Sequence, residues 1–156
     1  MDPTSSLSKE NNVDLSAEHI EERRNAARNP ANQTTLSVLS GGSVSLYEVA
    51  DPLETDHPIV TIQLKDPPAT LDETNYRIVL NTPLLERVEN ASENGSAPVM
   101  ARFTRSNGGK IMDVTVSVEG AGGEIQMEQT EEENGQPVAR LRNGEWARII
   151  GFTFQG

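Results

Sequence analysis

Few residues of this chain could do chemistry, and their spacing matches no common catalytic motif. The two histidines are His19 and His57, and His57 lies next to Pro58 in an acidic stretch. A hydrolytic triad needs a nucleophile, a base and an orienting acid that the fold brings together. The sequence has no G-x-S-x-G nucleophile elbow to supply the first of these. We therefore expect two surface histidines, no catalytic residues and no enzymatic activity.

Two acidic stretches could be interpreted as ligand sites. Residues 51–57 (DPLETDH) place four oxygen or nitrogen ligands close together, but a Ca²⁺ loop also needs a glycine turn and a terminal bidentate acid at set positions. Glu131–Glu133 is a bare charge run before an Asn-Gly pair, which is typical of a solvated hairpin tip. The absence of cysteine excludes disulfides and Cys-based metal sites. We expect no metal and no cofactor.

Three arginines are candidates for binding a partner protein. Arg140, Arg142 and Arg148 are expected to lie near one another across a hairpin, as a small basic patch on an acidic body. Two interpretations stay open. The patch contacts acids such as Glu131–Glu133 of another subunit, or it pairs with local acids across the strands.

Trp146 is the only tryptophan of the chain. A tryptophan buries a large apolar surface and is also enriched at interface hot spots, so it is either a core anchor or a partner contact. We expect it in the core or at its edge.

One short helix is predicted near the start of the chain, over residues 17–29. Ser16 (or Asp14) can cap it, acids come early and arginines come late, which complements the helix dipole. Pro30 is expected to end it. The apolar face is weak, so the helix is either a solvated surface element or an arm that docks on a neighbour. The residues that would bind a partner in the second case are Ile20, Arg23, Arg24 and Arg28.

The chain from residue 36 onward is predicted to be rich in strands. Asn-Gly pairs at 107–108, 134–135 and 143–144 lie between apolar runs. They are strong hairpin signals, since both residues tolerate a positive φ. Short connections favour an all-β fold, an antiparallel β-sandwich that is jelly-roll-like or a flattened barrel. The predicted strands are 44–49, 59–64, 76–80, 84–88, 99–105, 111–118, 124–128, 138–142 and 146–154.

Composition separates this part from the polar start of the chain. Residues 1–13 show no period and are expected to be disordered on their own, so we expect an extended N-terminal arm with the short helix over residues 1–35 and a β-sandwich domain over 36–156. The net charge is −11, which disfavours nucleic acid and suits a protein partner. No apolar run reaches the roughly 20 residues that span a bilayer, and no secretory signal is evident.

Three segments in order resemble a family of small virion structural proteins of tailed double-stranded DNA phages. They are GGSVSLY at 41–47, MARFTRSNGGKIMDVTV at 100–116, and the stretch from IQM to the closing GFTF at 125–154. The resemblance covers roughly residues 40–156. Val114 is a departure, because the family often has glycine there.

The resemblance implies a capsid decoration (cement) protein on the virion surface, made in the host cytoplasm. Its partner would be the major capsid protein, and it would act as a small homo-oligomer, a dimer or a trimer. No nucleic acid or membrane partner is expected. Two alternatives are a structural ring of the tail or neck and a carbohydrate-binding adhesion module.

Overall fold

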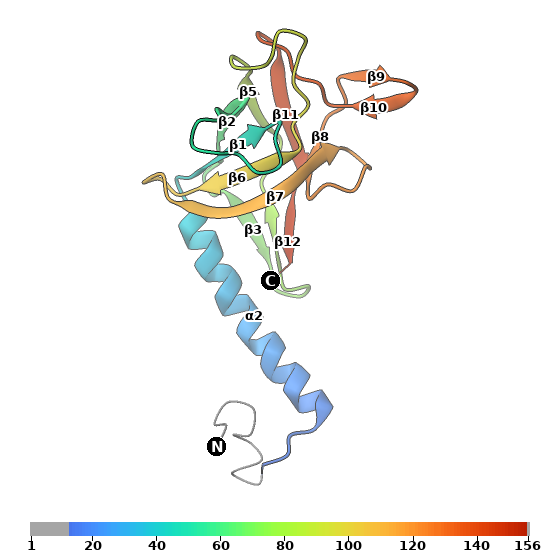
Figure 1. The fold of residues 1–156 in the computed structure, drawn as a ribbon. Helices are drawn as coiled ribbons and strands as arrows, with labels where there is room; N and C mark the ends of the chain where they lie inside the picture. The colour runs from blue at the N-terminus through green and yellow to red at the C-terminus, as the bar shows by residue number, and fades with distance from the viewer. Residues whose placement is uncertain (1–12, 156) are drawn as a thin grey trace.

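The computed structural model describes residues 13–155, which form one helix and a set of short strands (Figure 1). The disorder predicted for residues 1–13 lies outside the described residues, except at Val13. The chain is thus mostly β, as predicted, but it is not strictly all-β, because the predicted short helix is 23 residues long. Helix α2 spans Ala17–Leu39. The strands are β1 (Ser43–Tyr47), β2 (Val60–Gln63), β3 (Ala69–Asp72), β4 (Arg77–Leu80), β5 (Leu84–Arg87), β6 (Met100–Thr104), β7 (Lys110–Val118), β8 (Ile125–Met127), β9 (Glu131–Glu133), β10 (Gln136–Val138), β11 (Trp146–Gly151) and β12 (Thr153–Gln155).

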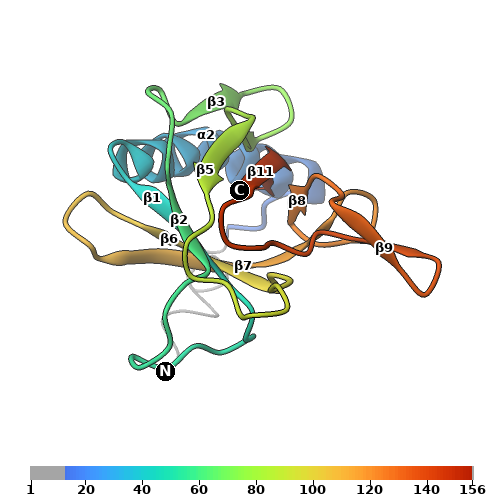
Figure 2. The same cartoon turned by 90° about the horizontal axis from the view of Figure 1, so that it is seen from above.

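Seven strands form a nearly closed mixed sheet in the order β2-β1-β6-β7-β8-β11-β5. Its two edge strands, β2 and β5, come to lie side by side without pairing (Figure 2). The strands β12-β4-β3 form a small second sheet, and β9 and β10 form a separate hairpin. The buried side chains make one core around Phe103, whose ring centroid lies 5.1 Å from that of Phe152.

One strand pair departs from the predicted antiparallel arrangement. Strands β7 and β8 run parallel, with Val116 opposite Ile125, and only residues 119–124 connect them. So short a crossover forces the chain against the strand that it leaves. A Cβ added at Gly123 would lie 2.4 Å from the backbone nitrogen of Ser117, so glycine is required there.

The Asn-Gly signals predict two of three hairpins. Asn134 and Gly135 both have positive φ (54° and 77°) and join β9 to β10, and Asn107-Gly108 joins β6 to β7. The hairpin predicted at Asn143-Gly144 is wrong, because β11 pairs with β5 and β8 instead of β10. The predicted strand 146–154 is divided at Phe152 between two sheets, and β3 and β9 were not predicted.

Helix α2 is longer than the sequence predicts, with 23 residues and Pro30 inside it. Ser16 caps it as expected, accepting a hydrogen bond from the His19 amide at 3.1 Å. The prediction that Pro30 ends the helix is wrong. Proline costs one backbone hydrogen bond, but the turns that follow pack on the body and bury Asn32 and Leu39, each 1% exposed. This tertiary packing overrides the local signal.

Candidate functional site

The side chains that could do chemistry do not gather into a reactive site. The Nδ1 atom of His19 lies 3.2 Å from the Glu22 carboxylate on the exposed helix, and His57 is exposed in the loop between β1 and β2. Among residues 13–155, no three His, Asp or Glu side chains are placed to hold a metal ion. Three exposed surfaces are the candidate sites.

The first surface is the first half of helix α2, which projects away from the β body (Figure 1). Every residue from Ala17 to Glu22 is exposed, as are Arg23 and Arg24. Ile20 keeps 38% of its surface exposed. The residues Ile20, Arg23, Arg24 and Ala27 line a surface hollow of about 370 Å³. Their spacing of three and four residues places them on one face of the helix, which we call the helix face.

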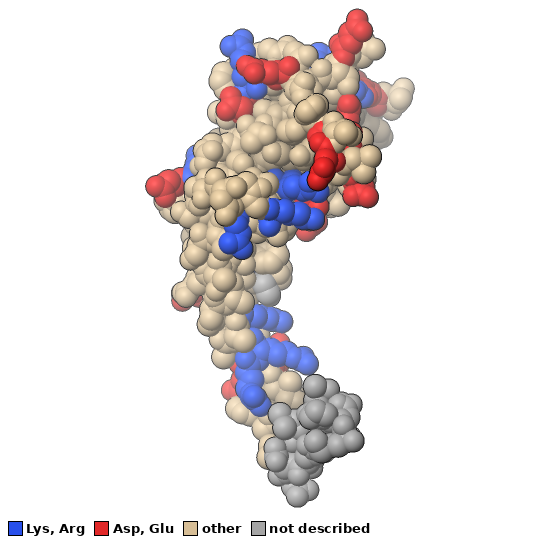
Figure 3. All heavy atoms as spheres, turned by 60° about the vertical axis from the view of Figure 1, so that its left-hand side comes forward, with Lys and Arg blue, Asp and Glu red and all other residues tan. Residues whose placement is uncertain are grey.

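Basic side chains gather on the helix face. Figure 3 shows Lys and Arg side chains along the projecting part of the helix with acidic side chains beside them, and side chains of both signs on the β body. The Arg24 guanidinium lies 3.6 Å from the Glu21 carboxylate, and the two side chains are 68% and 50% exposed. Such exposed pairs contribute little to stability. The guanidinium groups are thus available to a partner.

Arg28, the fourth predicted helix residue, belongs to the joint between helix and body. Its guanidinium lies over the Tyr76 ring, 5.5 Å from the centroid. The side-chain amide of the next residue, Asn29, donates a hydrogen bond to the Glu73 backbone carbonyl at 3.1 Å. These contacts hold the helix against the β3–β4 turn, so Arg28 separates the packed half of the helix from the projecting half.

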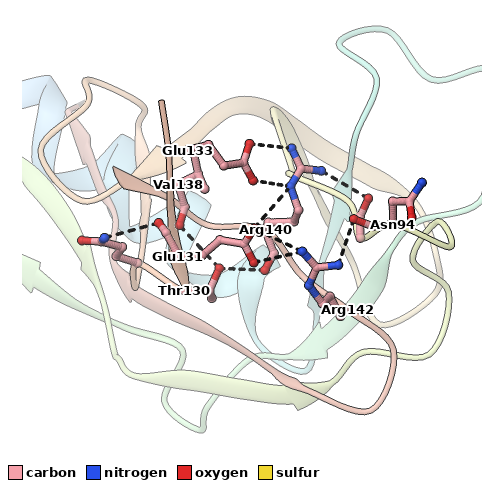
Figure 4. Close-up of polar contacts among 9 residues, drawn as sticks. Asn94, Thr130, Glu131, Glu133, Val138, Arg140 and Arg142 are labelled. Atoms are coloured by element: carbon pink, nitrogen blue, oxygen red, sulfur yellow. Dashed lines mark hydrogen bonds and ion pairs between the residues drawn. The ribbon is translucent and has the colours of Figure 1, made fainter. Parts of the chain in front are cut away.

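Arg140 and Arg142 are paired within the chain (Figure 4). Arg140 Nη2 donates to Glu133 at 3.0 Å, and Arg142 Nη2 donates to both carboxylate oxygens of Glu131 at 3.2 Å. Their other nitrogens donate to the carbonyls of Gly95 (3.3 Å) and Asn94 (3.1 Å). The two arginines therefore fasten the β9–β10 hairpin to the turn at residues 94–95.

This network replaces the basic patch that the sequence predicts. The patch is not formed, since Arg148 lies on β11 and pairs with Glu128 at 3.2 Å. The acids that meet Arg140 and Arg142 come from the same chain, as the local interpretation holds. The hydrogen bond from Arg140 also lowers the pKa of Glu133 and raises that of Arg140.

The second surface surrounds Trp146 on the outer side of strands β5 and β11. The core prediction for Trp146 is wrong: the residue is 58% exposed. In β11, Ala147 and Ile149 point into the core. Side chains alternate along a strand, so Trp146 and Arg148 point outward. Trp146 stands opposite Arg87 in the register, and Leu85, 49% exposed, stands opposite Arg148. Sequence reasoning missed Leu85 and Arg87.

The third surface is the acidic loop between β1 and β2. Its tip is Leu53, which is 69% exposed. The Leu53 amide donates to the Asp56 carboxylate at 2.7 Å, and the Asp56 amide donates back to the Leu53 carbonyl at 2.9 Å. The tip is thus a closed turn that presents Leu53 between the exposed carboxylates of Asp51 and Glu54. We call residues 51–56 the leucine loop.

Comparisons with known proteins give no relative from which a role for these surfaces could be taken. Searches against protein-family models, curated proteins and solved structures found no match. Within residues 13–155, no helix has the length and apolar character needed to cross a membrane. The three exposed surfaces are the features of the molecule that bear on its function.

Proposed function

We propose that this chain is a structural component of a phage particle, a decoration protein that binds the outer surface of the head. One observation carries the proposal: the first half of helix α2 projects from a folded body with its side chains exposed. The resemblance of residues 40–156 to virion structural proteins supports the same setting. The nearly closed sheet supports the finer proposal of a flattened barrel as the body.

The projecting half of the helix calls for a partner on energetic grounds. Most of the stability of a helix in a protein comes from tertiary packing of one of its faces. Residues 17–27 have little such support from their own body. A neighbouring subunit of the shell that covers the helix face would stabilise this half and be stabilised in return.

Trp146 offers the body its own contact with the major capsid protein. Tryptophan and arginine are the residue types most enriched at interface hot spots, and Trp146 stands beside Arg87 on an otherwise acidic body. In Figure 1 the start of β11 lies at the opposite end of the molecule from the first turn of α2. A single copy can therefore bridge two subunits of a lattice.

Stabilisation of the shell would follow from linkage. A ligand that binds only the assembled state stabilises it by about 3–4 kcal/mol at 100–1,000 times its Kd. Copies that are connected across one lattice add avidity, because the second contact of each copy forms at a high effective concentration. No catalytic step is needed for this role.

Deletion of residues 1–24 tests the proposal. The truncated chain begins at Asn25, a good N-cap residue, and keeps the joint contacts of Arg28 and Asn29. We expect it to fold and to lose binding to purified heads in a sedimentation assay. Full saturation of the heads by the truncated protein would contradict the role of the helix. The matched variant Trp146→Ser should weaken binding while the helix remains intact.

Copy number per particle separates the head from the tail or neck. Decoration requires on the order of hundreds of copies, whereas a ring around the tail axis requires about six or twelve. Quantitative gel analysis of purified particles would decide between them. A homo-oligomer, a dimer or trimer, is part of the proposal in either location.

A further inference from the structure

The helix face and the leucine loop carry opposite charges, and each has an exposed apolar residue at its centre. The helix face presents Arg23 and Arg24 around a hollow that Ile20 and Ala27 line. Leu53 of the leucine loop is the most exposed large apolar side chain within residues 13–155, and it lies between acidic residues. The loop thus offers an apolar side chain with negative neighbours, and the helix face offers an apolar hollow with positive neighbours.

Within residues 13–155, the carboxylates of the leucine loop form no ion pair. The hydrogen bond to Asp113 raises the pKa of the Arg102 guanidinium, and Asp51 is close enough to help raise it. Among the residues that the structure describes, no Lys or Arg nitrogen lies within 4.0 Å of Asp51, Glu54 or Asp56. Asp56 instead holds the turn through the Leu53 amide. The loop is therefore a preformed acidic tip, and little ordering is needed when it binds.

The two surfaces cannot meet within one copy. Ile20 is 19 residues before Leu39, the residue at which α2 enters the core. At 1.5 Å per residue this places it about 28 Å along a rigid helix. Figure 1 shows the first turn of the helix far below the β body that bears the β1–β2 loop. Any contact between the two surfaces must therefore join different copies.

We infer that the helix face of one copy binds the leucine loop of a second copy, with Leu53 seated in the hollow over Ile20 and Ala27. Arg23 and Arg24 of one copy then lie beside Asp51 and Glu54 of the next. The contact joins two different surfaces, so each copy gives one helix and one loop, and a closed dimer or ring uses both surfaces of every copy. This deepens the proposed assembly role, on which it rests, and assigns the partner of the helix.

The absence of cysteine makes a cross-linking test direct. We would mix Ile20→Cys protein with size-tagged Leu53→Cys protein at equal concentration, oxidise mildly and separate the products on a non-reducing gel. A disulfide requires Cβ atoms about 3.5–4.5 Å apart, so the mixed dimer should form at least about tenfold more than with a control on the same turn. That control is Glu22→Cys, which lies two residues and about 200° around the helix from Ile20.

Two results of this test would overturn the inference. One is an equal yield with Glu22→Cys, which would indicate random collision. The other is an Ile20→Cys homodimer that forms as fast as the mixed product, which would indicate pairing of helix with helix.

Charge reversal gives an independent test in solution. The double variant Arg23→Glu with Arg24→Glu, and the double variant Asp51→Lys with Glu54→Lys, should each self-associate about tenfold more weakly by sedimentation equilibrium. A mixture of the two should recover the association, because reversed helices then meet reversed loops. Added salt should weaken the wild-type association. A mixture that recovers nothing would contradict the pairing.

The two proposals can fail separately. Trp146→Ser, added to the cysteine variants, should weaken binding to heads and leave the cross-link between copies intact. If wild-type protein binds heads but the Ile20→Cys and Leu53→Cys proteins form no mixed disulfide, the inference is wrong and the proposed function stands. If the cross-link forms but no particle binds the protein, the proposed function is wrong.

Discussion

The two halves of helix α2 differ in composition and lie in opposite environments. From Arg28 to Leu39 the helix packs on the β body, stacks on Tyr76 and buries Asn32. From Ala17 to Ala27 it projects with nearly every side chain in solvent. The projecting half carries five charged residues, whereas the packed half carries only Arg28 and ends in Leu36, Val38 and Leu39. The difference teaches that apolar residues near the end of the helix anchor the packed half, while the charged half stays available to a partner.

The largest expected effect is at the end of the packed half. Leu39→Ala should lower the free energy of unfolding by about 3 kcal/mol, since it removes a fully buried side chain and leaves a cavity. Urea denaturation followed by tryptophan fluorescence or circular dichroism would measure it. A loss near zero would mean that the packed half does not belong to the cooperative core.

Acid should lower the free energy of unfolding of the β body, and the projecting half of the helix should not contribute to this loss. Arg140 holds the pKa of Glu133 below its ordinary value of 4.5. A carboxyl with a lower pKa in the folded state stabilises the fold fully above pH 4.5 and loses that contribution as pH falls through the folded pKa. Arg102 lowers the pKa of Asp113 in the same way.

We therefore expect stability to fall as the medium is taken from about pH 6 to about pH 3, with a shallower fall in Glu133→Gln. The chain truncated by residues 1–24 should follow the same curve as the full chain. A different curve would show that the projecting half contributes to the body's stability. Denaturant midpoints at each pH would give the comparison.

The joint between the halves should show a smaller effect. Arg28→Ala removes the stacking on Tyr76 and should cost about 0.5–1 kcal/mol, as a partly exposed cation–π contact does. Arg24→Ala, four residues earlier on the exposed face, is the matched control. Equal effects from the two variants would place the boundary between the halves elsewhere.

The smallest expected effect on stability is in the projecting half. Ile20→Ala should change the free energy of unfolding by less than about 0.5 kcal/mol, because Ile20 is exposed and contacts no core residue. The same variant should reduce self-association measurably. Loss of stability without loss of association would reverse the roles of the two halves.

The sequence predicts much of the scaffold because local patterns control it. The alternation of apolar residues locates most strands, and the Asn134-Gly135 turn has the positive φ values that its residue types favour. Ser16 caps the helix as predicted. Wherever one hydrogen bond or one turn decides the conformation, the local residues suffice.

The remaining features depend on contacts between distant segments. The helix continues past Pro30 because Leu39 joins a core that is assembled from later strands. The parallel β7–β8 pair depends on Gly123 passing against Ser117. No local pattern in the sequence contains either relation.

The candidate residues divide for the same reason. Arg140 and Arg142 resemble Arg23 and Arg24 in type, but the β9–β10 hairpin brings Glu131 and Glu133 to the first pair. Trp146 is outward because Ala147 takes the inward position of the strand. The strand register is what decides each of these outcomes.

Pro30 has a consequence for how α2 opens. Its ring nitrogen has no hydrogen to donate to the Ala26 carbonyl, so one backbone hydrogen bond of the helix is missing between the two halves. Amide hydrogen exchange should therefore divide the helix into two cooperative units, with slow exchange after residue 30 and fast exchange before it. Fraying that starts at Ala17 then stops near the proline, and a neighbouring copy that covers the helix face would slow exchange in the first unit alone.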